Sequence, residues 1–298
     1  MPTIADLEQK LRQHTQTPPV EAVLAQFRLD GVQQLAAKTG RNVIAYYSAF
    51  MTRRVQGIDI SDTDVNAFMN VVHGMDRRKG LDLVLHTPGG GITATEHLVH
   101  YLRDLFETDI RCIVPQAAFS AGTMIACATR EILMGRQSCL GPIDPQFNGY
   151  PCHGVIEEFK NAAEQIRNDP SYLAVWRPVI EQYQPTFLGE CQKAIEMSNE
   201  FVGDWLRTGM FAGNRRAKSK ARKIVEKLGS HAHTKTHDRH IPADEAAALG
   251  LNVKMIEKDQ DLQEKVLTLH HAFMLTFDRT KLVKIVLGNN GRQYQAGG

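Results

Sequence analysis

The segments HTPGGG (86–91) and AFSAG (118–122) are the most informative parts of this sequence. Each follows a short run of strand-forming residues, LDLVLH (81–86) or IRCIVP (110–115), and each opens a helical pattern. A strand, a turn and a helix that repeat at this spacing predict right-handed βαβ crossovers and a mainly parallel sheet. The helix after the second turn is apolar on every side, so we expect it to be the buried central helix.

The rest of the pattern indicates an α/β core that is interrupted by helices. Further strands are predicted at 42–47, 131–134 and 252–256, the last of these as the terminal strand, whereas helical periodicity replaces strand signals between 149 and 230. The expected organisation is a helical lead-in (1–40), the first part of the core (41–148), a helical insertion (149–230), a closing core segment (231–258) and a C-terminal tail (259–298) that begins with an amphipathic helix.

Composition and charge narrow the class of protein. The chain has 298 residues, of which 43% are hydrophobic and 23% charged, as is typical of a globular protein with a substantial core. The net charge of +2 gives no global field that would attract nucleic acid. No apolar run approaches the ~18–20 residues that cross a bilayer, and the N-terminus lacks a signal-peptide pattern. Five scattered cysteines without a C-x-x-C pair argue against a disulfide framework or a zinc site and suit the cytoplasm.

The glycine turn after the strand at 81–86 brings backbone N–H groups close to a ligand or a neighbouring segment. Gly89, Gly90 and Gly91 carry no Cβ that would prevent such an approach. A dinucleotide site is the main alternative, but it requires a G-x-G-x-x-G spacing that the stretch from Gly89 to Ala94 does not supply. We therefore expect no nucleotide cofactor.

Ser120 lies at a second strand-to-helix turn, which is how many hydrolases expose a nucleophilic hydroxyl. Taken alone, Ser120 is as well explained as the N-cap of the following helix. The two turns together favour chemistry, because the carboxyl ends of neighbouring parallel strands meet at one edge of a sheet. Backbone N–H groups of Gly89, with Gly90, and of Ala121 would then form an oxyanion hole beside Ser120.

Several motifs resemble the ClpP/crotonase-like serine proteases. The stretches HTPGGGITATEHLVHYLR (86–103) and AAFSAGTMIACA (117–128) are similar to the glycine turn and the nucleophile turn of ClpP, and HDRHIPADEA (237–246) is similar to its segment with the acid of the triad. The element LGPIDPQ (140–146) resembles that of the serine dehydrogenase proteinase family, which is related to signal peptide peptidase SppA. The resemblance covers about residues 40–160 and 235–256 and implies an α/β ClpP/crotonase-like spiral with an inserted helical subdomain.

The resemblance also implies roles for individual residues. Ser120 is the expected nucleophile, Gly89 and Ala121 are the expected oxyanion donors, and Asp238 is the expected acid. The general base departs from the ClpP pattern, because no histidine stands in the zone around Gly141 to Pro145.

Several residues are therefore candidates for the base. Lys160, on a predicted helix, is the first candidate by analogy with SppA-like proteins, followed by His237 and then His153. We expect Asp144 to cap a turn, although a bond to the site is an alternative.

Two clusters invite other functions. The histidines at 231, 233, 237 and 240 could suggest a metal, but they lack the H-E-x-x-H spacing, and we expect none. The basic run 215–227 could bind nucleic acid, although its interleaved apolar residues favour an amphipathic helix at the surface.

The sequence therefore predicts a soluble cytoplasmic serine peptidase that acts on a peptide or protein substrate. Because relatives of this fold work as rings, we also expect a homo-oligomer. One alternative is a crotonase-type acyl-CoA enzyme that uses the same pair of N–H donors on a thioester. The other is a catalytically degenerate member of the fold that serves as a scaffold or binding protein.

Overall fold

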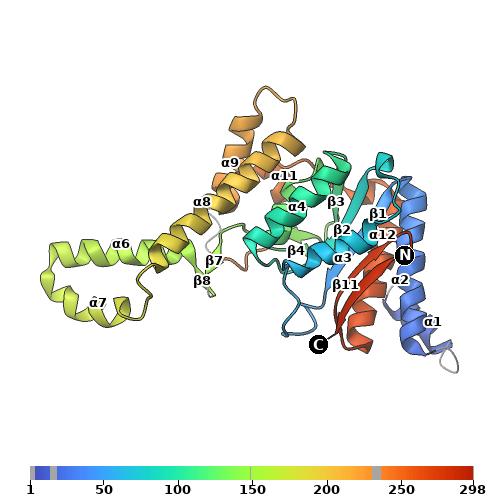
Figure 1. Cartoon of the computed structure of the whole chain (residues 1–298), viewed down its shortest axis with the longest axis horizontal. Helices are drawn as coiled ribbons and strands as arrows, with labels where there is room; N and C mark the ends of the chain where they lie inside the picture. The colour runs from blue at the N-terminus through green and yellow to red at the C-terminus, as the bar shows by residue number, and fades with distance from the viewer. Residues whose placement is uncertain (1–3, 14–18, 148, 230–235, 298) are drawn as a thin grey trace.

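The computed structural model describes residues 4–13, 19–147, 149–229 and 236–297 (Figure 1). Within them, seven strands form a central sheet in the order β10-β5-β3-β2-β1-β11-β12. Their bounds are β1 Asn42–Ser48, β2 Leu81–His86, β3 Ile110–Val114, β5 Glu131–Met134, β10 Val253–Met255, β11 Leu282–Gly288 and β12 Gln293–Gly297.

The sheet is mainly parallel, which confirms the predicted fold class. Strands β10, β5, β3, β2 and β1 run parallel, and only the C-terminal hairpin of β11 and β12 is antiparallel. Strand β10 corresponds to the strand predicted at 252–256, but it is not the terminal strand, because the tail returns to the sheet and pairs with β1. Every residue of β1 and β2 is buried, since helices cover both faces of the sheet.

Two sets of helices enclose the sheet (Figure 1). One face packs against α3 (Thr63–Val72), α4 (Ile92–Phe106) and α5 (Ala121–Cys127), and the other against α2 (Val20–Thr39) and α12 (Gln260–Arg279). Helix α1 (Ile4–Gln13) lies on the outside of α2 and α12. All seven residues of α5 are buried, as its apolar sequence requires.

The segment between the two parts of the core is helical, and part of it projects from the molecule. The helices are α6 (Cys152–Asn168), α7 (Leu173–Ile180), α8 (Phe187–Trp205) and α9 (Ala217–Gly229). Helix α8 extends from the core, and α6 and α7 form an arm at its far end (Figure 1). A small cluster of buried side chains joins α6 to α8, whereas α7 buries none of its residues. None of the described helices has the length and apolarity that crossing a bilayer would require.

A second, small sheet lies beside the carboxyl ends of the main strands. It consists of β4 (Ala117–Ala118), β6 (Cys139–Leu140) and β9 (Ile241–Pro242), and β9 leads into α11 (Ala243–Leu249). The hairpin of β7 (Gln146–Phe147) and β8 (Tyr150–Pro151) follows at the base of the arm. Residues 117–147 and 236–249 therefore meet at this edge, although they are far apart in sequence.

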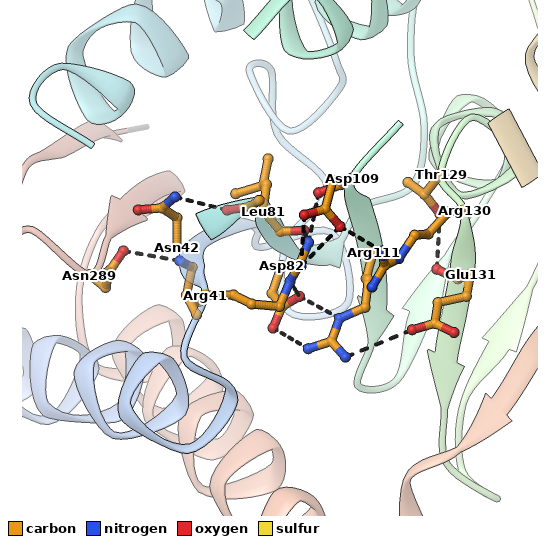
Figure 2. A network of polar contacts seen from close by, with 12 residues as sticks. Arg41, Asn42, Leu81, Asp82, Asp109, Arg111, Thr129, Arg130, Glu131 and Asn289 are labelled. Atoms are coloured by element: carbon orange, nitrogen blue, oxygen red, sulfur yellow. Dashed lines mark hydrogen bonds and ion pairs between the residues drawn. The ribbon is translucent and has the colours of Figure 1, made fainter. Parts of the chain in front are cut away.

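The opposite, amino edge of the sheet is closed by a network of charges (Figure 2). Asp82 is fully buried, and its Oδ1 accepts hydrogen bonds from Arg41 Nε at 2.8 Å and from Arg111 Nε at 2.7 Å. Arg41 also binds Asp109, which in turn pairs with Arg130. Removing one partner of such a buried pair typically costs ~3–5 kcal/mol, so this edge has a structural role.

Candidate active site

Ser120 occupies a strained turn between β4 and α5. Its backbone has φ 50° and ψ −116°, and Glu107 is the only other non-glycine residue with positive φ in the part of the chain that the structure describes. Non-glycine residues adopt such angles at a cost of about 1–3 kcal/mol, and they concentrate at functional sites. The side chain is half-buried at the N-terminus of α5, where the helix dipole favours negative charge.

The glycine turn that follows β2 lies directly against Ser120. A Cβ placed on Gly89 would stand 2.7 Å from Ser120 Cβ and 3.0 Å from Ala121 N, so only glycine permits this approach. Backbone hydrogen bonds hold the two turns together, because Phe119 N–H donates to Thr87 O at 3.0 Å. The structure therefore brings Ser120, Gly89, Gly90 and Ala121 to one place.

The backbone donors of the site differ in their availability. Gly89 N–H donates to Thr87 Oγ1 at 3.2 Å, and Gly91 N–H donates to Ile60 O at 2.9 Å. Among the described residues, no acceptor is recorded for Gly90 N–H, and Gly90 is exposed whereas Gly89 is buried. Ala121 is the first residue of α5, so its N–H has no acceptor within the helix. Gly90 and Ala121 thus offer the two N–H groups that a bound oxygen could use.

A buried carboxylate and a histidine form a pair at the same edge of the sheet. His237 Nδ1 lies 3.0 Å from Asp144 Oδ1; Asp144 is fully buried and the side chain of His237 is 19% exposed. A carboxylate that accepts from Nδ1–H fixes the proton on that nitrogen and leaves Nε2 as the acceptor. A carboxylate–histidine contact of this kind can orient an imidazole for proton transfer.

Phe119 connects this pair to the serine turn. A Cβ on Gly141 would stand 3.1 Å from Phe119 Cδ1, and Gly141 N–H donates to Thr123 Oγ1 of α5 at 2.9 Å. On the other side, the rings of Phe119 and His240 meet edge to face, with centroids 5.0 Å apart. Both segments that supply the Asp144–His237 pair therefore contact the residue that precedes Ser120.

Two of the residues considered in the sequence analysis, Asp238 and Lys160, are exposed. The backbone N–H of Asp238 donates to Thr236 Oγ1 within the turn that also carries His237. Lys160 is exposed on α6, in the arm that packs against α8 rather than against the sheet. No recorded contact of the described residues joins either side chain to Ser120.

The remaining candidates are placed as follows. His153 is half-buried near the start of α6, at the base of the arm. His231 and His233 lie outside the described residues. The basic run forms α9, an amphipathic helix that buries Ala221, Ile224 and Leu228 and exposes most of its charged side chains.

Asp144 is the site residue to which the sequence analysis gave only a minor role. Its signal was the LGPIDPQ element, in which a carboxylate follows the buried Ile143. A buried carboxylate requires a group that compensates its charge, and His237 offers such a contact from a distant segment.

A second histidine, His86, lies behind the glycine turn and is buried. Its ring stacks on Tyr47, with centroids 5.3 Å apart, and lies 5.3 Å from the ring of His270. Burial lowers the pKa of His86 to about 4, so this imidazole is neutral near pH 7. Burial also raises the pKa of the Cys112 and Cys127 thiols, which are structural groups rather than nucleophiles.

Comparison with known proteins gives one family and several relatives. The profile of the family described as ClpP-like SDH-type serine proteinase matches residues 20–286, a range that includes both turns and the Asp144–His237 pair. An uncharacterized protein of Methanocaldococcus jannaschii is 28% identical over 250 residues, which are 83% of this chain and 78% of that protein. A second uncharacterized protein of the same organism is 26% identical over 230 residues, or 76% and 71% of the two chains. Among solved structures, a membrane-bound stomatin-specific protease is similar with a TM-score of 0.41 and 16% identity, covering 70% of this chain and 79% of that chain.

Proposed function

Because this chain belongs to the family of ClpP-like SDH-type serine proteinases, we propose that it hydrolyses peptide bonds through an acyl-enzyme on Ser120. The observation that carries this proposal is the contact between the strained Ser120 turn and Gly89, which surrounds one hydroxyl with backbone N–H groups. A serine with only a capping role would require neither the strain nor the close approach of the glycine turn.

The proposed reaction begins with attack of Ser120 Oγ on the scissile carbonyl carbon. His237 Nε2 accepts the hydroxyl proton, and the carbonyl oxygen becomes an oxyanion between the N–H groups of Gly90 and Ala121. The protonated His237 then gives its proton to the leaving amine, so the C–N bond breaks and an acyl-enzyme remains. Water then attacks the ester while His237 accepts its proton, the bond to Ser120 Oγ breaks, and His237 returns the proton to Ser120 as the carboxylic acid product leaves.

Asp144 supports this cycle by its bond to His237. The carboxylate holds Nδ1–H, so the ring presents Nε2 as the acceptor, and it stabilises the imidazolium that forms during attack. Ser120 and His237 are not hydrogen-bonded to each other in the described structure, and in free enzymes such bonds are often long and tighten only with substrate. On the same geometric grounds we propose Asp144 rather than Asp238 as the acid and His237 rather than Lys160 as the base.

The two alternative functions have less support. An acyl-CoA enzyme would need a carboxylate base at the hole, but the buried carboxylate at this edge, Asp144, is engaged with His237. A degenerate scaffold was suggested by the absence of a histidine after Gly141, whereas the contact of His237 with Asp144 supports a histidine base from a distant segment. The observations thus favour the hydrolase.

The oligomer remains part of the proposal. Helix α7 exposes 52% of Leu173 and 64% of Val175, although its sequence is largely apolar. Such a surface is typical of a contact between proteins. We propose that the arm takes part in self-association of the chain.

A fluorophosphonate probe tests the proposed function. This reagent phosphonylates an activated serine, so we expect the intact chain to be labelled, with the modification mapped by mass spectrometry to the peptide containing Ser120. The variant Ser120→Ala should remain unlabelled and should lose peptide and ester hydrolysis while it keeps the circular dichroism spectrum of the wild type. Labelling at another serine, or hydrolysis that survives in the Ser120→Ala variant, would refute the assignment.

A further inference from the structure

We propose that Lys284, on strand β11 of the C-terminal hairpin, is a positioning residue that fixes the orientation of the oxyanion donor Gly90 N–H. The connection runs from Lys284 through Asp64 and the segment 59–61 to the glycine turn. This inference rests on the proposed function, and it gives the C-terminal tail a role in the site.

Lys284 and Asp64 form a buried ion pair. The two side chains are only 3% and 1% exposed, and Lys284 Nζ lies 2.9 Å from Asp64 Oδ1 and 3.0 Å from Oδ2. Tyr46 O–H also donates to Asp64 Oδ2 at 2.9 Å, and burial together with Asp64 raises the pKa of Tyr46, which therefore keeps its proton. A buried pair of this kind contributes little net stability compared with apolar residues of similar size, so its value lies in the geometry that it imposes.

The pair holds the segment 59–61 from both sides. Lys284 Nζ donates to Asp59 O at 2.7 Å, and Asp64 Oδ2 accepts from Ser61 N–H at 3.0 Å. Ile60, which lies between these two anchored residues, is 2% exposed. Its backbone is therefore fixed in position and direction.

Ile60 in turn pairs with the glycine turn. Ile60 N–H donates to Gly89 O at 2.7 Å, and Ile60 O accepts from Gly91 N–H at 2.9 Å. A Cβ on Gly90 would stand 2.3 Å from Ile60 N, so the two backbones are in direct contact. Ile60 and Gly90 thus form a parallel bridge that holds the carbonyl of Gly89, while Thr95 binds the carbonyl of Gly91 on the helix side of the turn.

The direction of Gly90 N–H follows from the bond to Gly89 O. The carbonyl of Gly89 and the N–H of Gly90 belong to the same peptide unit, and in a trans peptide they point in opposite directions. When Ile60 N–H holds the carbonyl, Gly90 N–H must point away from Ile60. Glycines on both sides of this peptide offer little steric resistance to rotation, so without the anchor the donor would be lost from the hole.

A double variant tests this role. Lys284→Met with Asp64→Leu removes both charges together. No unpaired charge is then left in the core, so the fold should persist. We expect kcat for a peptide ester to fall by about 10²-fold, because one oxyanion donor is worth about 10²–10³ in kcat, while KM changes little. The Ki of a peptidyl trifluoromethyl ketone, whose hemiketal oxygen occupies the hole, should rise by a similar factor.

A matched control separates positioning from stability. Asp82→Leu with Arg111→Met removes a buried ion pair at the amino edge of the sheet, opposite the edge where the turns lie, and also leaves Arg41 Nε without its acceptor Asp82 (Figure 2). This control should lower the thermal midpoint without changing kcat below it. If the Lys284 variant does not fold, Asp64→Asn, which keeps an acceptor for Ser61 N–H but weakens the hold of Lys284, should lower kcat in the same direction.

The results distinguish this inference from the proposed function. The positioning role is refuted, and the hydrolase stands, if the wild type is labelled at Ser120 but the Lys284 variant keeps its kcat. The same holds if kcat of the Lys284 variant falls no more than kcat of the control, when each is measured the same number of degrees below its own thermal midpoint. If the wild type is not labelled at Ser120, both are refuted. A fall in kcat with unchanged KM, seen only in the Lys284 and Asp64 variants, supports the role.

Discussion

Replacing Asp144 by asparagine tests the acid–base pair directly. The substitution keeps the size of the side chain but removes the charge that faces His237 Nδ1 at 3.0 Å. The charges on the ring and the carboxylate would lie about 4 Å apart, which at an effective dielectric constant of about 20 corresponds to about 4 kcal/mol of stabilisation of the imidazolium. We therefore expect kcat to fall by about 10³-fold, since each 1.36 kcal/mol is tenfold in rate.

The assay is hydrolysis of a peptide ester with matched variants beside it. Asp238→Asn makes the same chemical change one position after His237, on an exposed side chain, and Lys160→Met removes the exposed lysine of α6. Both controls should stay within about twofold of the wild type, as surface substitutions generally do. The reasoning is refuted if Asp144→Asn retains its kcat, or if Asp238→Asn or Lys160→Met loses as much as Asp144→Asn does.

Two further predictions concern the glycine turn and the buried histidine. In Gly89→Ala the new Cβ would stand 2.7 Å from Ser120 Cβ, on a residue with φ of +107°. We expect the free energy of unfolding in urea to fall by about 1–3 kcal/mol and fluorophosphonate labelling to be lost. Normal labelling would contradict the close approach of the two turns. His86 should make the free energy of unfolding depend on pH. Its pKa is about 4 in the folded state, below the ordinary 6.5, so the unfolded chain takes up this proton at a higher pH than the folded chain does. Stability is therefore lost as the pH falls from about 6.5 to about 4. The loss should approach about 3 kcal/mol, and His86→Phe should flatten the profile of unfolding free energy against pH; an equally steep profile in that variant would exclude His86 as the cause.

The turns could be predicted from sequence because local residues determine them. Strand β2 ends at the residue expected, and the glycines that follow it are required by positive φ angles at 89 and 90. The small residues around Ser120 similarly indicate a close approach to another segment. Their convergence followed from the topology of a parallel sheet, which is a general property of the fold.

The acid–base pair could not be predicted in the same way. Asp144 and His237 are 93 positions apart, and they meet because β6 pairs with β9, two short strands that the helical insertion separates in sequence. Asp238 was favoured by its place in a motif, but its side chain is exposed, whereas the neighbouring His237 is the residue that contacts the buried Asp144. Lys160 was favoured by analogy with SppA-like proteins. The hydrophobic periodicity of a helix does not predict the direction in which that helix extends from the core.

The C-terminal hairpin shows a different limit. The residues LVKIVLG (282–288) have the composition of a buried strand except for Lys284, which interrupts the apolar run. That lysine is buried because its partner, Asp64, is supplied from a position 220 residues away. A charged residue in a core strand is evidence of a distant countercharge, but the sequence does not say which one.

The strained backbone at Ser120 lowers the stability of the folded protein, although it holds the hydroxyl in the position that the proposed reaction requires. With φ at 50°, the turn stores about 1–3 kcal/mol that a residue without a Cβ would release. Ser120→Gly should therefore unfold at a higher temperature than the wild type, whereas Ser120→Ala retains the strain and should not. The Ser120→Gly variant would lack the hydroxyl and would be the more thermostable form with which to capture bound polypeptides. In a homologue that no longer needed the reaction, loss of this one side chain would increase stability.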